Sequence, residues 1–253
     1  MVPSVLRRSR STIAVIGASA LVGALFAGFF RRSPQVAQPI LPVTERVQAG
    51  PLLDRTGAWL TVGDPASRVR VQTATLPGLL YRISAASDAG IVPVVTRRGG
   101  RVAVRFRATQ GDGLDEVHIV LNRDVRWDIR LPAGGGEQQL NLADGQVSRV
   151  ELGASGLAEV TLPDPAGTVP VTFTGGVGTA VLRAGPAAVF RIRLEGGAGA
   201  VETPWVVNNG TPSGAVLQEA GWPRAADRYA VRAVAGMGSV ILRRSGPDPR
   251  PTP

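Results

Sequence analysis

The sequence predicts an all-β protein of stacked short strands, on three observations. Between Arg126 and Glu195, seven segments each place two apolar residues two positions apart, as a half-buried strand does. The second apolar residue recurs every 9 to 12 residues, and Gly, Pro or Asp-Gly stands in nearly every gap. Aromatic residues make up only 5% of the chain, which suits narrow layers of Leu, Val and Ala. The seven pairs are Ile129 and Leu131, Leu140 and Leu142, Val150 and Leu152, Val160 and Leu162, Val171 and Phe173, Ala180 and Leu182, and Ile192 and Leu194.

Three architectures can hold such strands. In a β-solenoid-like fold or two-layer β-roll, each strand stacks on its equivalent in the next turn of the chain, so that inward Leu, Val and Ile form columns. An antiparallel β-sandwich would use the same turns as hairpins, and a closed barrel is the third arrangement. The near-constant spacing favours the β-solenoid-like or two-layer roll, with the antiparallel β-sandwich as the alternative.

The amino-terminal segment predicts one transmembrane helix at residues 11–30. This run of 20 residues has no charge, and a helix rising ~1.5 Å per residue would cover the ~30 Å hydrocarbon core of a bilayer. Its end lacks the small-residue pattern that signal-peptide cleavage needs, so we expect an uncleaved anchor. Three Arg precede the run and two follow it, which places residues 1–10 in the cytoplasm and the later chain outside the plasma membrane.

The rest of the chain divides into a linker, a domain and a tail. Residues 31–63 contain four Pro and no sustained periodicity, which predicts a Pro-rich extracytoplasmic linker, with Trp59 as a candidate lid over the fold. Alternation that begins at Arg68 predicts one β-roll domain over residues 64–244. The Pro-rich residues 245–253 are expected to form a disordered tail.

The amino-acid composition limits the classes of partner that this protein is expected to bind. The net charge is +9, but residues 1–32 hold five Arg and no acid, so the later chain has 28 − 5 = 23 Arg against 19 acids, or 23 − 19 = +4. This modest excess argues against a nucleic-acid partner, because nucleic-acid binding needs a concentrated basic face. Cysteine is absent, so the chain has no disulfide, no thiolate metal site and no cysteine for a lipid anchor.

Catalytic chemistry leaves no pattern in the sequence, so we predict no enzyme, no cofactor and no metal site. The single histidine, His118, lies between two apolar residues of a predicted strand and is therefore expected on its solvated face. Ser155 lies in a Gly-containing turn with no histidine near it in sequence. Asp115 and Glu116 are neighbours on a strand and point to opposite faces, so they cannot act on one substrate atom.

A basic strand is the first candidate binding site. Arg101, Arg105 and Arg107 share one face of a predicted strand, and Arg97 and Arg98 lie in the adjoining turn. Guanidinium groups bind phosphate and carboxylate bidentately, so this face could meet lipid headgroups or an anionic wall polymer. The alternative is a solvated strand face whose charges discourage edge pairing.

An irregular stretch from Thr203 to Asp227 is the second candidate. It contains Trp205 and Trp222, two of the four tryptophans of the chain. Long unpatterned loops within compact domains often have a function. The stretch is therefore interpreted either as a cap over the open end of the roll or as a loop that binds a partner.

Several turn motifs resemble a known bacterial class. They are Leu131-Pro132-Ala133-Gly134, Leu140-Asn141-Leu142, Val160-Thr161-Leu162-Pro163 and Thr174-Gly175-Gly176, with the closing stretch from Gly221-Trp222 to Gly238-Ser239-Val240. The chain resembles the toast-rack and putative-adhesin β-roll domains of actinobacterial membrane-anchored type, related to the C-terminal domain of LiaF-like cell-wall-active antibiotic response proteins. The similarity covers roughly residues 64–244. It implies a β-helical roll facing the cell exterior and, in some relatives, regulation of envelope-stress signalling, although LiaF-like proteins usually have several spans.

Together these features predict a single-pass membrane protein with its amino terminus inside. Its extracytoplasmic β-roll would be a non-enzymatic interaction or structural module of the bacterial envelope. The expected partner is another membrane protein or an anionic envelope polymer, and regulation of an envelope-stress response is the sharpest hypothesis. The alternative is an anionic wall-polymer or carbohydrate binding module.

Overall fold

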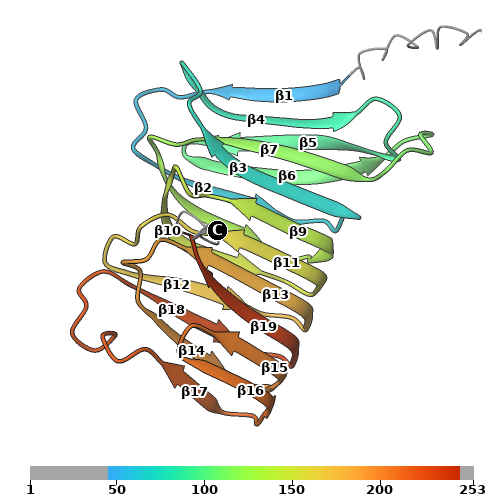
Figure 1. The fold of residues 1–253 in the computed structure, drawn as a ribbon. Coiled ribbons are helices and arrows are strands. Elements are labelled where there is room, and N and C mark those ends of the chain that lie inside the picture. Colours follow the sequence, from blue (N-terminus) through green and yellow to red (C-terminus); the bar gives the residue numbers. More distant parts are fainter. Residues whose placement is uncertain (1–44, 246–253) are drawn as a thin grey trace, which may run out of the picture. The chain divides into compact units, whose positions relative to one another are not determined.

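Residues 45–245 of the computed structural model form two β-sheets around one hydrophobic core (Figure 1). The structure describes these residues, so the predicted cytoplasmic segment 1–10, the anchor 11–30 and the tail from residue 246 lie outside it. Within residues 45–245 no helix is long and apolar enough to cross a membrane. The strands are β1 Glu45–Pro51, β2 Gly57–Val62, β3 Arg68–Ala74, β4 Leu79–Ala86, β5 Ile91–Arg98, β6 Arg101–Ala108, β7 Glu116–Asn122, β8 Arg126–Leu131, β9 Gly135–Asn141, β10 Gln146–Leu152, β11 Ser155–Thr161, β12 Thr168–Phe173, β13 Val177–Ala184, β14 Phe190–Leu194, β15 Ala198–Thr203, β16 Val206–Thr211, β17 Ala215–Gln218, β18 Arg228–Ala233 and β19 Met237–Arg244.

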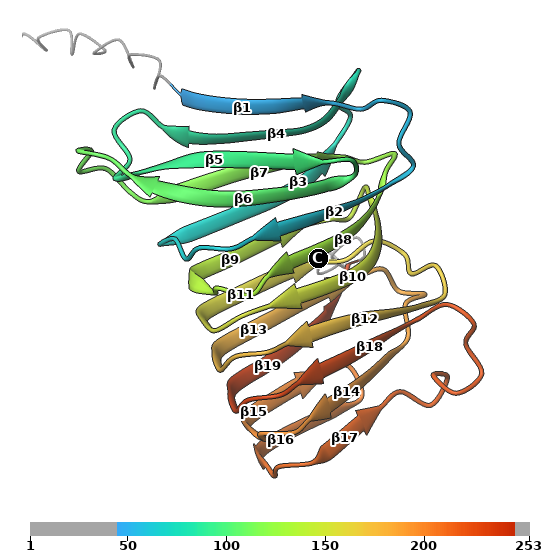
Figure 2. The same cartoon turned by 180° about the vertical axis from the view of Figure 1, so that it is seen from behind.

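The central strands form parallel rungs, which confirms the predicted two-layer roll. From β8 to β13 the chain alternates between a nine-stranded and a ten-stranded sheet, and Figure 2 shows the nine-stranded sheet in front. Val150 of β10 lies beside Ile129 of β8 on one side and Val171 of β12 on the other, and all three are fully buried. Leu142, Leu152 and Leu162 are buried as well. Parallel pairing in two open sheets excludes the antiparallel sandwich and the closed barrel.

Strands near both ends of the described chain, but not the first strand β1, occupy interior positions of the stack. β18 lies between β12 and β14 in one sheet, and β19 lies between β13 and β15 in the other (Figures 1 and 2). In the same way β2 lies between β6 and β8, and β3 lies between β7 and β9. The outermost strands, β5 and β17 in one sheet and β1 and β16 in the other, pair antiparallel with their neighbours. The rungs are therefore stacked in an order that differs from the order of the chain.

The roll begins at Glu45 and not at the predicted boundary, residue 64. β1 pairs with β4, and β2 pairs with both β6 and β8, so residues 45–62 belong to the domain and not to a linker. The prediction counted Pro51 as part of a Pro-rich linker. Pro51 is instead the last residue of the edge strand β1, where a proline removes no hydrogen bond from the sheet. Trp59 projects from β2 between buried Ala58 and Leu60, so it lies on the outer face of the sheet and is not a lid.

The irregular stretch before β18 holds two strands that the sequence did not reveal. β16 pairs antiparallel with β15, and β17 pairs antiparallel with β14. β16 contains Asn208-Asn209-Gly210 and is mostly exposed, so it lacks the apolar alternation of a half-buried strand. These two strands are the outermost strands of their sheets, at the end of the stack opposite β1 and β5.

A column of glycines lets the strands of the ten-stranded sheet approach each other closely at their starts. A side chain at Gly178 of β13 would place its Cβ 2.6 Å from the carbonyl oxygen of Gly156 on β11. A side chain at Gly238 of β19 would place its Cβ 2.3 Å from the carbonyl oxygen of Gly178. Real Cβ atoms do not come that near, so these positions accept only glycine unless the backbone moves.

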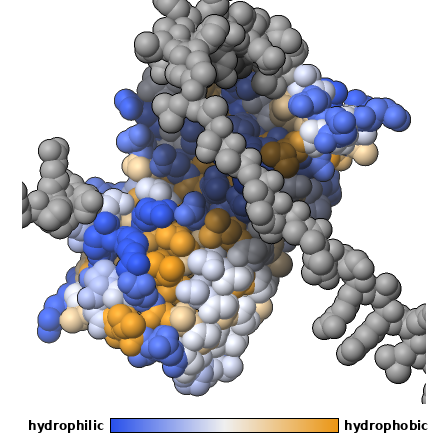
Figure 3. Space-filling model, turned by 45° about the vertical axis from the view of Figure 1, so that its right-hand side comes forward, coloured by the Kyte–Doolittle hydropathy of each residue, from blue (hydrophilic) through white to orange (hydrophobic). Residues whose placement is uncertain are grey.

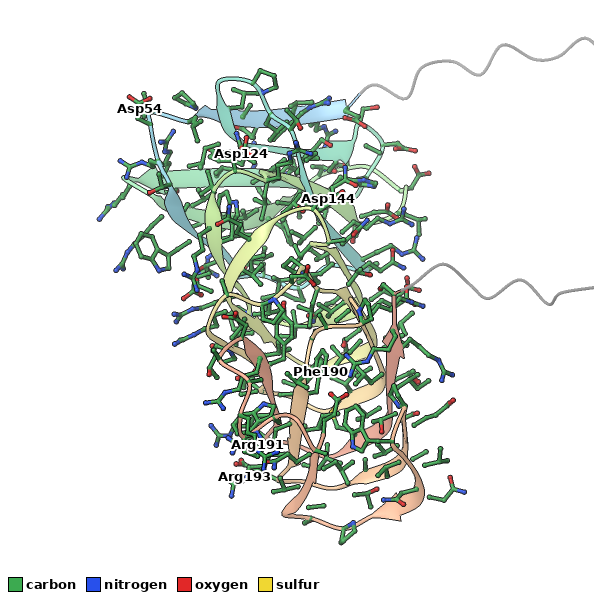
Figure 4. The ribbon with its side chains drawn as sticks, turned by 60° about the vertical axis from the view of Figure 1, so that its left-hand side comes forward. Asp54, Asp124, Asp144, Phe190, Arg191 and Arg193 are labelled. Carbon is green, nitrogen blue, oxygen red and sulfur yellow. The ribbon has the colours of Figure 1, made fainter. Side chains whose placement is uncertain are left out.

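The outer faces of the two sheets are mainly polar. On β14, Phe190 is fully buried, whereas Arg191 and Arg193 project from the outside of the roll (Figure 4). In Figure 3, hydrophobic atoms on one face form small areas bordered by hydrophilic atoms. Alternation along each strand therefore supplies the core on one side and rows of polar side chains on the other.

Candidate binding surface

The five arginines of the predicted basic strand lie on a hairpin at one end of the nine-stranded sheet. β5 and β6 pair antiparallel, with Arg98 opposite Arg101, and Gly99 turns the chain at a φ of 60°. Val102 and Val104 are buried, so Arg101, Arg105 and Arg107, which alternate with the apolar residues of β6, point outward. Arg98 lies opposite Arg101 and shares this face, whereas Arg97 lies opposite buried Val102. The hairpin lies next to β2, which carries Trp59.

Two of the five arginines are held by the fold. Arg105 pairs with Asp64 at 2.7 Å and donates to the carbonyl oxygen of Gly63 at 3.1 Å. Asp64 also accepts the backbone N–H of Phe106 at 2.8 Å, and this bond, followed by the bond from Arg105, holds the pKa of Asp64 below its usual value. Arg97 donates to the carbonyl oxygens of Pro51 and Gly99 at 2.6 and 3.0 Å. Arg97 and Arg105 therefore tie the hairpin to neighbouring loops.

The other three arginines have no carboxylate partner within residues 45–245. Arg98, Arg101 and Arg107 form no ion pair there, although the ion pairs of this sheet include Arg130 with Asp128 and Arg232 with Glu195. The guanidinium carbon of Arg101 lies 5.6 Å from the centre of the Trp59 ring, within the range of a cation–π contact. Three guanidinium groups are thus left able to bind an external anion.

Trp59 stands between two hollows on the outer face of the nine-stranded sheet. Its side chain remains 45% exposed. One hollow, of about 350 Å³, is lined by Trp59 together with Thr61, Ala103, Arg101 and Arg130, and it also reaches Val102. The other, of about 310 Å³, is lined by Thr56, Gly57, Ala58, Trp59, Arg126 and Ser148. The volumes fall at the lower end of those of small-ligand sites.

Register explains why these side chains meet. Arg101 of β6, Trp59 of β2, Asp128 of β8 and Arg149 of β10 occupy directly neighbouring positions on four adjacent strands. Adjacent strands lie about 4.8 Å apart, so the row forms a continuous line of polar and aromatic groups. The register of β10 against β8 shifts between Val147 and Arg149, which leaves Ser148 unpaired next to this row.

The two tryptophans of the carboxyl-terminal stretch have other surroundings. Trp222 is buried between the guanidinium groups of Arg191 and Arg228, at 4.0 and 4.2 Å from its ring centre, and its Nε1–H donates to the carbonyl oxygen of Tyr229. Trp205 is partly buried against the core. Trp222 is therefore enclosed by the fold, whereas Trp205 keeps part of its side chain accessible.

The residues considered for catalysis are separated in the structure. His118 on β7 is exposed and contacts the carboxylate of Glu116, and it borders a hollow of about 410 Å³ that also includes Glu45 and Asp88. Ser155 lies on β11, and β3 and β9 separate that strand from β7. Among residues 45–245 no three His, Cys, Asp or Glu side chains are grouped so as to hold a metal ion.

Sequence reasoning missed Trp59 as a surface residue, although a signal was present. Ala58, Leu60 and Val62 alternate with Trp59 and Thr61, which places the tryptophan on the face opposite the core. The four prolines of residues 31–63 drew the prediction toward a linker instead. The register that brings Arg101 beside Trp59 joins segments of the chain that no local pattern connects.

Comparison with known proteins shows the fold. No protein-family model matches the chain, and no curated protein matches it. A solved structure of a putative cell adhesion protein from Clostridium sporogenes ATCC 15579 matches with a TM-score of 0.63 at 15% identity, over 80% of this chain and 99% of that one. This likeness supports the predicted β-roll and leaves the predicted relation to LiaF-like proteins without a test.

Two further solved structures match less well. A putative adhesin from Bacteroides fragilis NCTC 9343 has a TM-score of 0.31 at 7% identity, over 79% of this chain and 97% of that one. Another from Parabacteroides distasonis ATCC 8503 has a TM-score of 0.25 at 9% identity, over 80% and 98%. Both scores are too low to add to the structural comparison.

Proposed function

We propose that this protein is a non-enzymatic interaction module of the bacterial cell envelope. Residues 11–30 would hold it in the plasma membrane with the amino terminus inside, and the β-roll would stand outside. The observation that carries the proposal is the outer face of the nine-stranded sheet, where Arg98, Arg101 and Arg107 have no carboxylate partner within residues 45–245 and Trp59 is exposed. The likeness in fold to a protein described as a cell adhesion protein supports the same class of function.

The absence of cysteine makes the membrane topology directly testable. Ser213 lies in an exposed turn before β17, and Ser4 precedes the predicted anchor. In intact cells a membrane-impermeant maleimide should label the S213C variant and spare the S4C variant, and both should react after lysis. Labelling of S4C alone in intact cells, or protection of both sites, would reject the proposed orientation.

We further propose that the β-roll binds another membrane protein and thereby regulates an envelope-stress response. The resemblance to LiaF-like domains motivates this proposal, and the single predicted span separates the chain from them. A strain lacking the gene should show an altered basal or antibiotic-induced level of a cell-wall-stress reporter, restored by the full chain. An unchanged reporter at both levels would remove the regulatory role and leave the interaction module in place.

The second candidate function is binding of an anionic envelope polymer by the arginine hairpin. The structure sharpens the choice of variants, because Arg105 is already paired with Asp64 whereas Arg98, Arg101 and Arg107 are not paired within residues 45–245. The triple charge reversal R98E/R101E/R107E should abolish binding of the full chain to poly-L-glutamate, a soluble polyanion. In the parent, binding should weaken as salt rises, because salt screens exposed charges.

Arg224 supplies the matched control for this experiment. It is exposed in the loop before β18 and forms no ion pair within the described residues. The R224E variant should therefore retain binding apart from a small general loss from its changed net charge. If R224E weakens binding as much as one reversal in the hairpin does, net charge alone attracts the polymer and the hairpin has no special role.

A further inference from the structure

Trp59 has the surroundings of a stacking platform. Small side chains flank it on both sides, with Thr61 and Ala103 lining one hollow and Gly57 and Ser148 the other. The indole is 45% exposed and lines both hollows, and the guanidinium of Arg101 lies over its ring. An aromatic ring exposed in this way can stack on a flat ligand with little loss of conformational freedom.

The guanidinium groups at the rims of the hollows differ in how firmly they are held. Arg130 is bound to both carboxylate oxygens of Asp128, at 2.8 and 2.9 Å. Arg126 donates to the carbonyl oxygen of Ala166 at 3.0 Å. Arg101 forms neither an ion pair nor a side-chain hydrogen bond within residues 45–245, and it lies over the Trp59 ring. Arg101 is therefore the rim arginine whose donors are all free for a ligand within residues 45–245.

We infer that Trp59 and Arg101 form a subsite for one acidic sugar of a polysaccharide, a ring that carries a carboxylate. The apolar face of the sugar would stack on the indole, and the carboxylate would accept two hydrogen bonds from the guanidinium of Arg101. This inference rests on the second candidate function and names its ligand class. Arg98, directly across β5 and β6 from Arg101, extends the cationic row, so a polymer binds better than a single sugar.

The geometry favours a sugar over the other anionic polymers. An acidic peptide would need the arginines but not the exposed indole. A single-stranded nucleic acid also stacks on aromatic rings, but such proteins present several rings along a positively charged groove. Trp59 is accompanied in its register row by Arg101, Asp128 and Arg149 and by no second ring.

The test is a titration of the purified full chain with four probes at one salt concentration. They are polygalacturonate, which has acidic sugars; dextran, which has neutral sugars; poly-L-glutamate, which has carboxylates without sugars; and single-stranded polydeoxythymidylate. Polygalacturonate should bind most tightly. Its affinity should fall about ten-fold in W59A and by a similar factor in R101A, and W59F should keep most of it. R224A is the matched arginine control and should match the parent.

Each other outcome overturns the inference. Equal binding of polygalacturonate and poly-L-glutamate, unaffected by W59A, would mean a surface that recognises charge alone, which leaves the second candidate function standing. Equal binding of dextran and polygalacturonate would remove the role of Arg101, and tightest binding of the oligonucleotide would replace the ligand class. No binding of any probe would reject both the subsite and the anionic-polymer function. Trp59 and Arg101 are exposed, so unchanged circular dichroism should show that the variants remain folded.

Discussion

The two sheets of the roll share one core but differ on their outer faces. On the ten-stranded sheet most arginines pair with carboxylates, for example Arg68 with Glu116 and Glu137, Arg183 with Glu159, and Arg243 with Glu202. On the nine-stranded sheet Arg101 and Arg107 form no ion pair within residues 45–245, and Trp59 is exposed between two hollows. The nine-stranded sheet also contains paired arginines, Arg105, Arg130 and Arg232, but it differs in leaving Arg101 and Arg107 unpaired, among the described residues, beside an exposed aromatic ring.

The two sheets also differ in how closely and how regularly their strands pair. The ten-stranded sheet brings its strands close at a column of glycines that includes Gly156, Gly178 and Gly238. The nine-stranded sheet has a register shift beside Ser148, which borders one of the hollows at Trp59. The ten-stranded sheet has a register shift too, but at its edge strand β1, between Gly50 and Pro51, and not in its centre. A bulge leaves one residue unpaired and bends its strand locally. Under the proposed function, the ten-stranded sheet would serve stability and the nine-stranded sheet recognition.

The largest expected effect comes from the glycine column. In G238A the new Cβ would lie 2.3 Å from the carbonyl oxygen of Gly178, so β19 must move away from β13. We expect a loss of about 3 kcal/mol or more in the free energy of unfolding, measured by urea denaturation.

G57A on the nine-stranded sheet is the matched control for this variant. Its Cβ would meet nothing nearer than the carbonyl oxygen of Arg126 at 3.8 Å, which is ordinary contact. Its unfolding free energy should stay within about 0.5 kcal/mol of the parent. Similar losses in the two variants would show that the close approach in the ten-stranded sheet does not constrain the fold.

Patterns that recur locally could be predicted from the sequence, whereas pairings between distant segments could not. Inward positions such as Leu131, Leu152 and Phe173 recur locally, so alternation and spacing were enough to predict the strands and the two-layer roll. The insertion of β18 between β12 and β14 joins residues about sixty positions apart, as in the pairing of Thr168 with Arg228, and no local pattern records it.

The binding surface was predicted only in part for the same reason. The arginines of β6 were visible because Arg101, Arg105 and Arg107 alternate with apolar residues. Two of the hairpin arginines have donors occupied by residues distant in the sequence. Arg105 donates to Asp64, forty-one positions before it, and Arg97 donates to the carbonyl oxygen of Pro51. Burial of Trp222 likewise depends on Arg191 and Arg228, which lie on separate strands.

A smaller effect is expected from Glu116, whose carboxylate pairs with both Arg68 and Arg70 on the ten-stranded sheet. Burial acts to raise the pKa of Glu116, but hydrogen bonds from Arg68 and His118 and the charge of Arg70 bring it below its usual value. A carboxyl group with a lowered pKa in the folded state adds stability above its unfolded pKa, and this is lost as the pH falls through the folded pKa. E116Q should therefore lose about 1 kcal/mol at neutral pH, an amount kept small by solvent screening, and should lose less stability than the parent on acidification.

Urea denaturation at several pH values between about 3 and 7 measures this effect. The parent and E116Q should approach each other as the pH falls, because protonation removes in the parent the charge that the substitution removes in the variant. A constant difference across the range would mean that Glu116 stabilises the sheet by packing and not by its charge.

The smallest expected effect is the difference in thermal stability between removing a paired arginine and removing an unpaired one. Arg243 contacts the carboxylate of Glu202 on the ten-stranded sheet, whereas Arg107 has no carboxylate partner within residues 45–245. R243A should lower the thermal unfolding temperature slightly at low salt, and R107A should leave it unchanged or raise it, because Arg107 shares its strand face with Arg105. At ~1 M salt, where the Debye length is ~3 Å, the two variants should unfold together. If R107A proves the more destabilising at low salt, Arg107 belongs to the structural charges and the division of roles between the two faces fails at that residue.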